Sequence, residues 1–185
     1  MRRVVSTCVI AVLISCHSNP TSNTHTQAGS DSTIPSATQD NTYAYPISYS
    51  SNFVMGDSKN CQAVLNIWKA WESGDLSKLK DYYADSVELH FWDGTLVHNT
   101  RDSAIAAAQT FRNTLTGVRC SVAAVTAIKS KEKDENWALF WGTETLTFKD
   151  GKTDSSFLQE TWRFNKDGKA DLMYQYAEKP NVRKK

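Results

Sequence analysis

Apolar side chains recur at helical spacing in three segments of the C-terminal two thirds of the chain. Over residues 58–73 they fall at i, i+3, i+4 and i+7 and form one stripe, made of Cys61, Val64, Leu65, Trp68 and Trp71. Asp57 or Ser58 can cap the first turn, and Gly74 can end the helix in a left-handed conformation. The same spacing predicts a short second helix after Asp75 and a third over residues 102–116.

Alternating apolar and polar residues predict a sheet in the rest of this region. The expected strands cover residues 86–92, 118–128, 136–148, 153–165 and 170–177, with a short extended piece at 96–98. Asp150-Gly151 and Asp167-Gly168 are hairpin signals between the last three strands. Helices followed by an antiparallel meander are typical of an α+β fold, and residues 56–180 are enough to form one domain.

Composition narrows the function classes. The chain has 185 residues, a formal charge of +1 and six Trp, all between Trp68 and Trp162. Loss of Arg2 and Arg3 with a leader would take the charge to −1, which gives no basic surface for nucleic acid. No Ser-His-Asp elbow, phosphate loop or dinucleotide fingerprint occurs, and no cofactor is predicted.

The first residues have the parts of an export signal. Arg2-Arg3 precedes a mostly apolar run over residues 4–14, which is too short to span a bilayer. It ends in Leu13-Ile14-Ser15-Cys16, which resembles the lipobox of bacterial lipoproteins. That resemblance implies a signal peptide over 1–15, lipidation of Cys16, and attachment to a membrane of the bacterial cell envelope, facing the periplasm or the exterior. An ordinary signal peptide with a chance Cys is the alternative.

Residues 16–55 are interpreted as a flexible tether, because Ser, Thr, Asn, Gln and Pro dominate their first part. The aromatic patch of Tyr43, Tyr45, Tyr49 and Phe53 differs from the rest and can lie against the domain. Pro46 and the neighbouring serines argue against a regular element there.

Several short motifs stand in a specific order across the predicted domain. They are Trp71-Glu72-Ser73-Gly74-Asp75, Tyr83-Ala84-Asp85, Asp93-Gly94, Trp162-Arg163-Phe164, Asp167-Gly168-Lys169 and Gln175-Tyr176. Together they resemble the SnoaL-like group of the nuclear transport factor 2-like (NTF2-like) superfamily. The resemblance implies a cone in which three N-terminal helices pack on a strongly curved antiparallel sheet, with a pocket at the open end. Its members include isomerases, cyclases, dehydratases and pure binding modules, so the fold does not fix the function.

The resemblance also allows a check of ketosteroid isomerase chemistry, which uses a tyrosine, a shuttle aspartate and a late protonated aspartate. By ungapped counting the tyrosine position is Ile67 and the shuttle position is Phe91, whereas Glu160 stands at the late aspartate. Two of the three roles are therefore missing, and that chemistry is not expected.

Three residues remain as candidate catalytic groups. Glu160 has apolar neighbours on its own face, which would raise its pKa and suit it to acid–base work; the plain alternative is a cross-strand contact or a solvated side chain. His90 and His98 could supply a base, although a lone strand histidine is more often at the surface. They could also form a metal pair with Asp93 or Glu88, but no HxH, HExxH or CxxC spacing supports it, so no metal site is predicted.

The remaining candidates are expected to line a ligand cavity, because such cavities are mostly aromatic with few polar groups. They are Trp68, Tyr83, Phe91, Trp92, Glu144, Trp162, Tyr174 and Tyr176. Plain core packing is the alternative for each aromatic residue. A disulfide between Cys61 and Cys120 is an open option.

Three functions follow. The first is a lipid-anchored module that binds a small hydrophobic molecule or a protein partner without catalysis. The second is an isomerase, cyclase or hydro-lyase that uses Glu160 as acid or base. The third is a structural component of an envelope complex that forms a homodimer through the outer sheet face.

Overall fold

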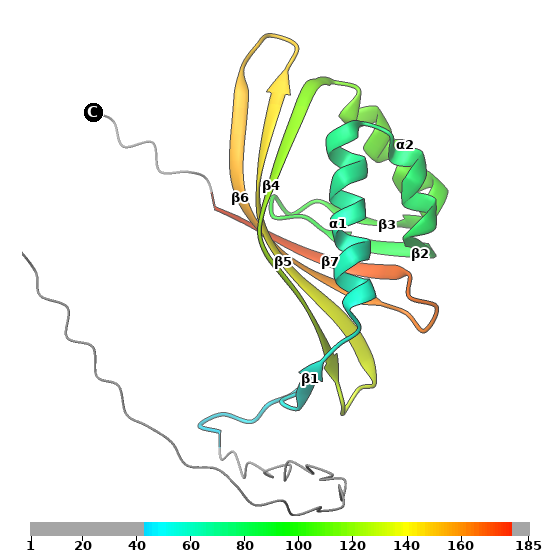
Figure 1. The fold of residues 1–185 in the computed structure, drawn as a ribbon, viewed down its shortest axis with the longest axis vertical. Coiled ribbons are helices and arrows are strands. Elements are labelled where there is room, and N and C mark those ends of the chain that lie inside the picture. The colour runs from blue at the N-terminus through cyan, green and yellow to red at the C-terminus, as the bar shows by residue number, and fades with distance from the viewer. Residues whose placement is uncertain (1–42, 179–185) are drawn as a thin grey trace, which may run out of the picture. The chain divides into compact units, whose positions relative to one another are not determined.

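The computed structural model describes residues 43–178, which form seven strands, two α-helices and one 3-10 helix (Figure 1). In chain order these are β1 (Phe53–Met55), α1 (Ser58–Ser73), η1 (Leu76–Asp81), β2 (Tyr83–His90), β3 (Leu96–Thr100), α2 (Arg101–Arg112), β4 (Leu115–Ser130), β5 (Glu135–Phe148), β6 (Thr153–Phe164) and β7 (Ala170–Glu178). Three helical segments on a sheet confirm the α+β prediction.

Helix α1 begins after Asp57 and ends at Gly74, as the sequence predicts. Asp57 accepts a hydrogen bond from the Lys59 backbone N–H, and Gly74 adopts a left-handed φ of 83°. The other two helices differ from their predictions. The short second helix is 3-10, and α2 ends at Arg112, because Leu115 already belongs to the long strand β4.

The sheet has the order β1-β4-β5-β6-β7-β2-β3. Strands β4 to β7 form the predicted antiparallel meander, in which the long strands twist around α1 (Figure 1). The sheet is nevertheless mixed, because β2 pairs with β7 in parallel. These two strands are joined through a long stretch of chain rather than by a hairpin, so no turn forces them to be antiparallel.

Three turns share one design. In each, an Asp-Gly pair closes a three-residue loop in which the glycine has a positive φ: Gly94, Gly151 and Gly168. Such a loop is a type I turn followed by a left-handed residue. The sequence alone left open whether the Asp150-Gly151 loop has two residues, which would pair Glu160 with Trp141. The three-residue loop places Glu160 opposite Phe140 instead.

Packing on the sheet begins before the expected domain boundary at residue 56. Strand β1 pairs with β4, the Ser50 hydroxyl lies 2.7 Å from that of Ser130, and the Tyr49 ring meets Trp137 edge-on at 6.4 Å. The end of the predicted tether therefore packs on the domain. The predicted signal peptide, Cys16, most of the tether and residues 179–180 lie outside the described residues.

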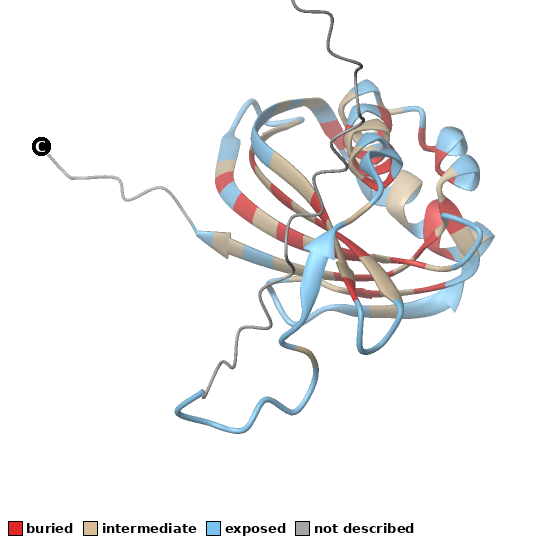
Figure 2. Ribbon diagram, turned by 60° about the horizontal axis from the view of Figure 1, so that its bottom comes forward, coloured by how far each residue is buried: buried red, intermediate tan, exposed pale blue. Residues whose placement is uncertain are grey.

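The core lies between α1 and the sheet face that it covers, here called the inner face (Figure 2). From α1 it contains Val64, Ile67 and Trp68, and from β5 and β6 it contains Phe140, Leu158, Trp162 and Phe164. Side chains alternate along each strand, so the residues between these point to the opposite, outer face.

Candidate functional site

Glu160 is at the centre of the inner face and only 3% exposed. Its Oε2 atom accepts hydrogen bonds from the indole Nε1 of Trp68 at 2.7 Å and of Trp162 at 2.8 Å. Its Oε1 atom accepts from the Gln175 amide at 2.8 Å. A carboxylate removed from water is costly unless it is hydrogen-bonded, and here three donors replace the lost water.

Burial raises the pKa of Glu160 above its ordinary value, and the donors from Gln175, Trp68 and Trp162 oppose that shift. Burial also raises the pKa of the Tyr83 hydroxyl, and the charge of Glu160 adds to the effect. The Tyr83 ring stacks on Trp162 at 6.1 Å. The predicted cavity residues Trp68, Tyr83 and Trp162 thus surround Glu160, as core side chains packed on one another.

A second carboxylate of the inner face also binds α1. Glu144, on β5, accepts a hydrogen bond from the Trp71 indole, and Glu72 of α1 accepts one from the Cys120 backbone N–H at 3.1 Å. Burial, followed by the charges of Glu144 and Glu72, raises the pKa of the Cys120 thiol to about 12. Cys120 and Cys61 are both free thiols.

The two candidate histidines do not join Glu160. The His90 ring packs against the Tyr174 ring at 4.7 Å. Tyr174 pairs with Thr161, the neighbour of Glu160 whose side chain points to the outer face. His90 also lies 2.6 Å from Glu88, which pairs with His98 in the next strand. The structure therefore separates the expected catalytic set: Glu160 lies on the inner face, whereas His90 and His98 lie on the outer face.

The outer face carries a groove of about 420 Å³, here called the outer groove. Its lining is Tyr49, Phe53, Trp137, Thr161, Arg163, Leu172, Tyr174 and Tyr176. Five of these eight side chains are aromatic, and Tyr49 and Phe53 come from the segment before α1. The volume lies within the range of small-molecule sites.

Charge in the outer groove is paired. The Arg163 guanidinium donates to Asp171 through Nε at 3.0 Å and through Nη2 at 3.3 Å, and its Nη1 lies 3.9 Å from Glu135. Glu135 in turn accepts from the Trp137 indole at 3.3 Å. With its cation already held by two carboxylates, the groove suits an uncharged apolar molecule better than an anion.

Comparison with known families matches residues 64–172 to the SnoaL-like domain. The chain belongs to the SnoaL-like domain family. Similar solved structures include an LEH-like epoxide hydrolase from M. tuberculosis, with a TM-score of 0.55 at 12% identity over 65% of this chain and 79% of that one. A putative SnoaL-like polyketide cyclase from Jannaschia sp. has a TM-score of 0.54 at 12% identity, over 66% and 87% of the two chains.

An NTF2-like protein of unknown function from Burkholderia pseudomallei has a TM-score of 0.52 at 21% identity, over 66% and 92% of the chains. At these identities the likeness shows that the SnoaL-like domain has the NTF2-like fold. A comparison with functionally curated proteins finds no match.

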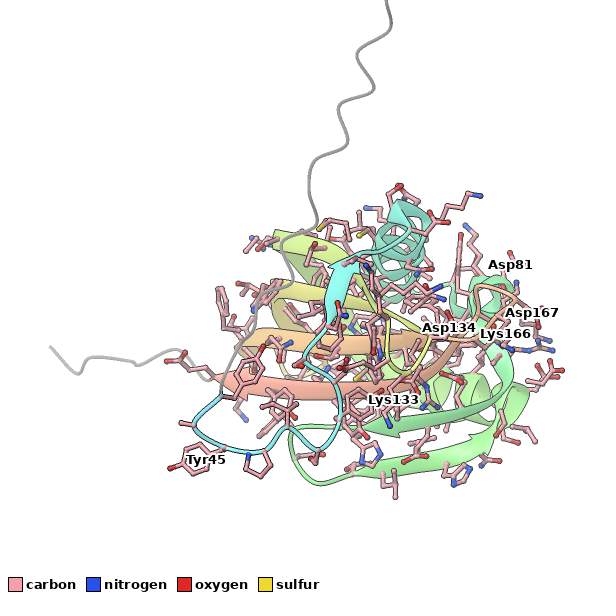
Figure 3. All side chains as sticks on the ribbon, turned by 90° about the horizontal axis from the view of Figure 1, so that it is seen from below. Tyr45, Asp81, Lys133, Asp134, Lys166 and Asp167 are labelled. Atoms are coloured by element: carbon pink, nitrogen blue, oxygen red, sulfur yellow. The ribbon has the colours of Figure 1, made fainter. Side chains whose placement is uncertain are left out.

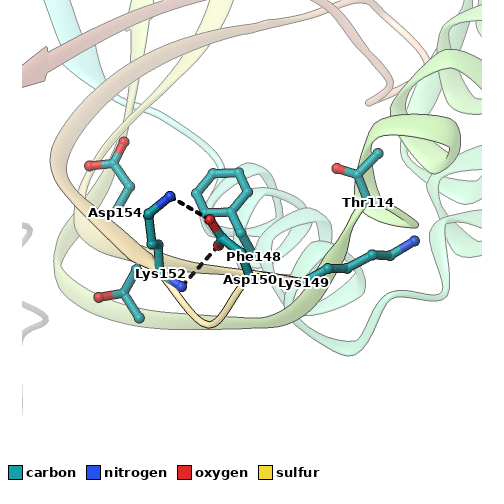
Figure 4. Close-up of a pocket in the computed structure, with 7 residues that line it drawn as sticks. Thr114, Phe148, Lys149, Asp150, Lys152 and Asp154 are labelled. Carbon is teal, nitrogen blue, oxygen red and sulfur yellow. Dashed lines mark hydrogen bonds and ion pairs between the residues drawn. The ribbon is translucent and has the colours of Figure 1, made fainter.

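The SnoaL-like domain has a second hollow, of about 500 Å³, at the β5–β6 turn (Figure 4). Its walls are the turn residues Phe148, Lys149, Asp150, Lys152, Thr153 and Asp154, with Thr114. Lys152 donates to Asp150 at 2.6 Å and so closes the turn on itself. It has one aromatic side chain, against five in the outer groove, and several charged side chains at the tip of a turn.

Two further predicted ligand residues lie outside the outer groove. Phe91 packs partly against the core, and Trp92 is 49% exposed in the Asp93-Gly94 turn. Within residues 43–178 no helix is long and apolar enough to cross a membrane, and no three His, Cys, Asp or Glu side chains are placed to hold a metal ion.

Sequence reasoning placed Tyr174 and Tyr176 in a ligand site, but it missed Trp137, Arg163, Leu172 and Thr161 beside them. Alternation along β5 to β7 could have grouped these residues on one face, given the register. Tyr49 and Phe53 were noticed as an aromatic patch, but nothing local indicates which strands they reach.

Proposed function

We propose that this SnoaL-like domain is a non-catalytic module that binds a small uncharged hydrophobic molecule in the outer groove. The observation that carries the proposal is the contrast between the two faces. On the inner face, Glu160 is buried with both oxygens engaged, whereas on the outer face five aromatic side chains line an open groove.

The lining favours a flat apolar ligand. Aromatic rings offer large rigid surfaces that bind apolar molecules at little cost in conformational entropy. The Arg163–Asp171 pair leaves no unpaired cation among the lining residues, so a ligand gains little from a negative charge. Thr161 supplies a polar group that can orient the ligand.

We further propose that the protein acts in the bacterial cell envelope, attached through a lipid on Cys16. The Leu13-Ile14-Ser15-Cys16 sequence behind a basic and apolar leader supports this. Metabolic labelling with a fatty-acid analogue tests it: Cys16→Ala should abolish incorporation, and equal labelling of the variant would rule out this anchor.

A cavity enzyme that uses Glu160 is the alternative. The raised pKa of Glu160 favours it, and proteins of similar structure include one described as an epoxide hydrolase and one described as a putative polyketide cyclase. A substrate would first have to displace the Trp68 indole or the Gln175 amide from the carboxylate. A non-catalytic dimeric role through the outer face remains a third option and would cover the outer groove.

A fluorescence titration with the neutral probe N-phenyl-1-naphthylamine tests the groove. Tyr176 lines the groove and is 61% exposed, so Tyr176→Ser should leave the fold intact and weaken binding about tenfold, the size expected for one lost aromatic contact. Trp92→Ser is the matched control, because Trp92 is exposed to a similar degree outside the groove, and binding should not change.

Glu160→Gln separates the two faces in the same titration. If binding occurs in the outer groove, this variant should bind the probe as the unsubstituted protein does. Loss of binding in Glu160→Gln together with normal binding in Tyr176→Ser would place the ligand on the inner face and contradict the proposal.

A further inference from the structure

The segment before α1 exposes an unusual amount of apolar surface. Thirteen large hydrophobic residues of the described chain are exposed, and seven of them lie in residues 43–55. The part from residue 43 to residue 49, here called the aromatic loop, holds four of the seven: Tyr43, Tyr45, Ile47 and Tyr49. Exposed apolar patches of this kind mark contact surfaces for proteins or membranes.

The aromatic loop is held at its C-terminal side and projects beyond the sheet. The Ser51 backbone N–H donates to Glu132 at 2.9 Å, the Lys131 N–H donates to the Asn52 carbonyl at 2.9 Å, and Lys133 lies over the Tyr49 ring at 5.7 Å. Tyr45 is 80% exposed at the outer bend of the segment, away from the strands (Figure 3). Pro46 has no backbone N–H, so the loop cannot pair throughout as an added strand.

Charge beside the loop is balanced. The β4–β5 turn brings Lys129, Lys131 and Lys133, and it also brings Glu132, Asp134 and Glu135. Lys129 pairs with Asp134 at 2.7 Å. The turn therefore neither attracts an anionic surface strongly nor is repelled by it, and apolar contact is the interaction that the loop can offer.

We propose that the aromatic loop docks into the boundary between the head groups and acyl chains of a lipid bilayer. Tyrosine suits this boundary, because its ring is apolar and its hydroxyl stays hydrated. The inference rests on the proposed anchor at Cys16, which would place a bilayer on the N-terminal side of the loop. Residues 17–42 are the only chain between that anchor and the loop.

Docking would also place the outer groove beside the membrane. Tyr49 belongs to both the loop and the groove lining, and Phe53 follows in the same segment. A hydrophobic ligand could then enter the groove from the bilayer without crossing water, which accords with the apolar lining.

Tryptophan quenching by lipids that carry bromine on their acyl chains tests the contact. The lipidated full chain is reconstituted into phosphatidylcholine vesicles, and its six native Trp give the baseline. Tyr45→Trp should add emission that the brominated lipid quenches, and Ile47→Trp should do the same if the first variant folds poorly. Phe111→Trp is the matched control on α2, which packs on the inner face; the native side chain is 50% exposed, and its added emission should not be quenched.

Equal quenching at positions 45 and 111, or none at 45 and 47, would overturn the proposal. Quenching that appears only with anionic lipids and disappears in high salt would also overturn it, because the lysines would then carry the contact. A negative quenching result would rule out membrane docking but not ligand binding in the outer groove, because the probe titration that tests ligand binding contains no vesicles.

Discussion

The indole of Trp68 donates a hydrogen bond of 2.7 Å to the carboxylate of Glu160, 92 residues later in the chain. The bond joins the middle of α1 to the middle of the sheet. Trp162 and Gln175 also donate to this carboxylate, so both oxygens of the group that most resembles a catalytic acid are already hydrogen-bonded within the protein.

Replacing Glu160 with Gln should stabilise the fold at neutral pH. The carbonyl of the introduced amide can face the two indoles, and a flipped Gln175 amide can accept from the introduced NH₂ group, so the contacts survive without a buried charge. The pKa of Glu160 is raised in the folded state. The contribution of Glu160 to the free energy of unfolding is therefore complete below the unfolded pKa of about 4.3, and it is lost as pH rises through the folded pKa. Urea unfolding at several pH values should show that Glu160→Gln has a higher free energy of unfolding than the unsubstituted protein, and that this difference shrinks on acidification. A gain that is the same at every pH would mean that Glu160 titrates normally.

The Trp68→Phe variant should lower the free energy of unfolding by between about 1.5 and 3 kcal/mol, because a buried carboxylate loses a donor. The cost should be smaller when Trp68→Phe is combined with Glu160→Gln, since a neutral acceptor needs that donor less. A double-mutant cycle measures the difference. Strict additivity would show that the loss comes from packing of Trp68 on Phe140 alone.

Gly142 on β5 should not tolerate a methyl group. A Cβ atom there would lie 2.6 Å from the Phe140 ring and 2.7 Å from the Ser121 carbonyl, so Gly142→Ala should cost about 1–3 kcal/mol. Gly117→Ala on β4 is the control, because its Cβ would meet Thr147 at an ordinary 3.7 Å and the change should stay within about 0.5 kcal/mol. Similar melting temperatures for the two variants would show that the Phe140 ring and the β4 backbone at Ser121 both move aside easily.

Truncation should separate the tether from the segment that packs on the sheet. A chain that starts at Asn41 should melt within a few degrees of one that starts at His17, because residues 17–40 contain almost no large apolar side chain. A chain that starts at Gly56 should melt roughly 5–10 °C lower, since it lacks β1 and the Tyr49 contact with Trp137. Scanning calorimetry compares the three, and a large drop for the Asn41 chain would show that the earlier residues pack as well.

Much of the fold could be predicted because its signals are local. The stripe of α1, its Asp57 and Gly74 ends and the alternation of β5 to β7 each depend on neighbours in the sequence. The burial of Glu160 could also be predicted, since Leu158, Trp162 and Phe164 share its face.

Two of the three hydrogen-bond partners of Glu160 could not be predicted, because Trp68 comes from α1 and Gln175 from β7. The residue opposite Glu160 on β5 also depends on register. With the observed three-residue loop Phe140 lies opposite Glu160, whereas a two-residue loop would place Trp141 there. No local pattern in the sequence decides between the two loop lengths. The sequence likewise put His90 beside Glu88, but it could not tell which sheet face α1 would cover. The pairing of β2 with β7 and of β7 with β6 separates His90 from Glu160, because it sets His90 level with Tyr174 and Thr161.

Methyl NMR provides the most direct test of where the ligand binds. Leu172 lines the outer groove and Leu158 lies in the core on the inner face, so their methyl signals report on the two faces separately. On addition of N-phenyl-1-naphthylamine, the account predicts that the Leu172 signals shift and the Leu158 signals stay in place. Shifts at Leu158 with none at Leu172 would place the ligand beside Glu160 and contradict it.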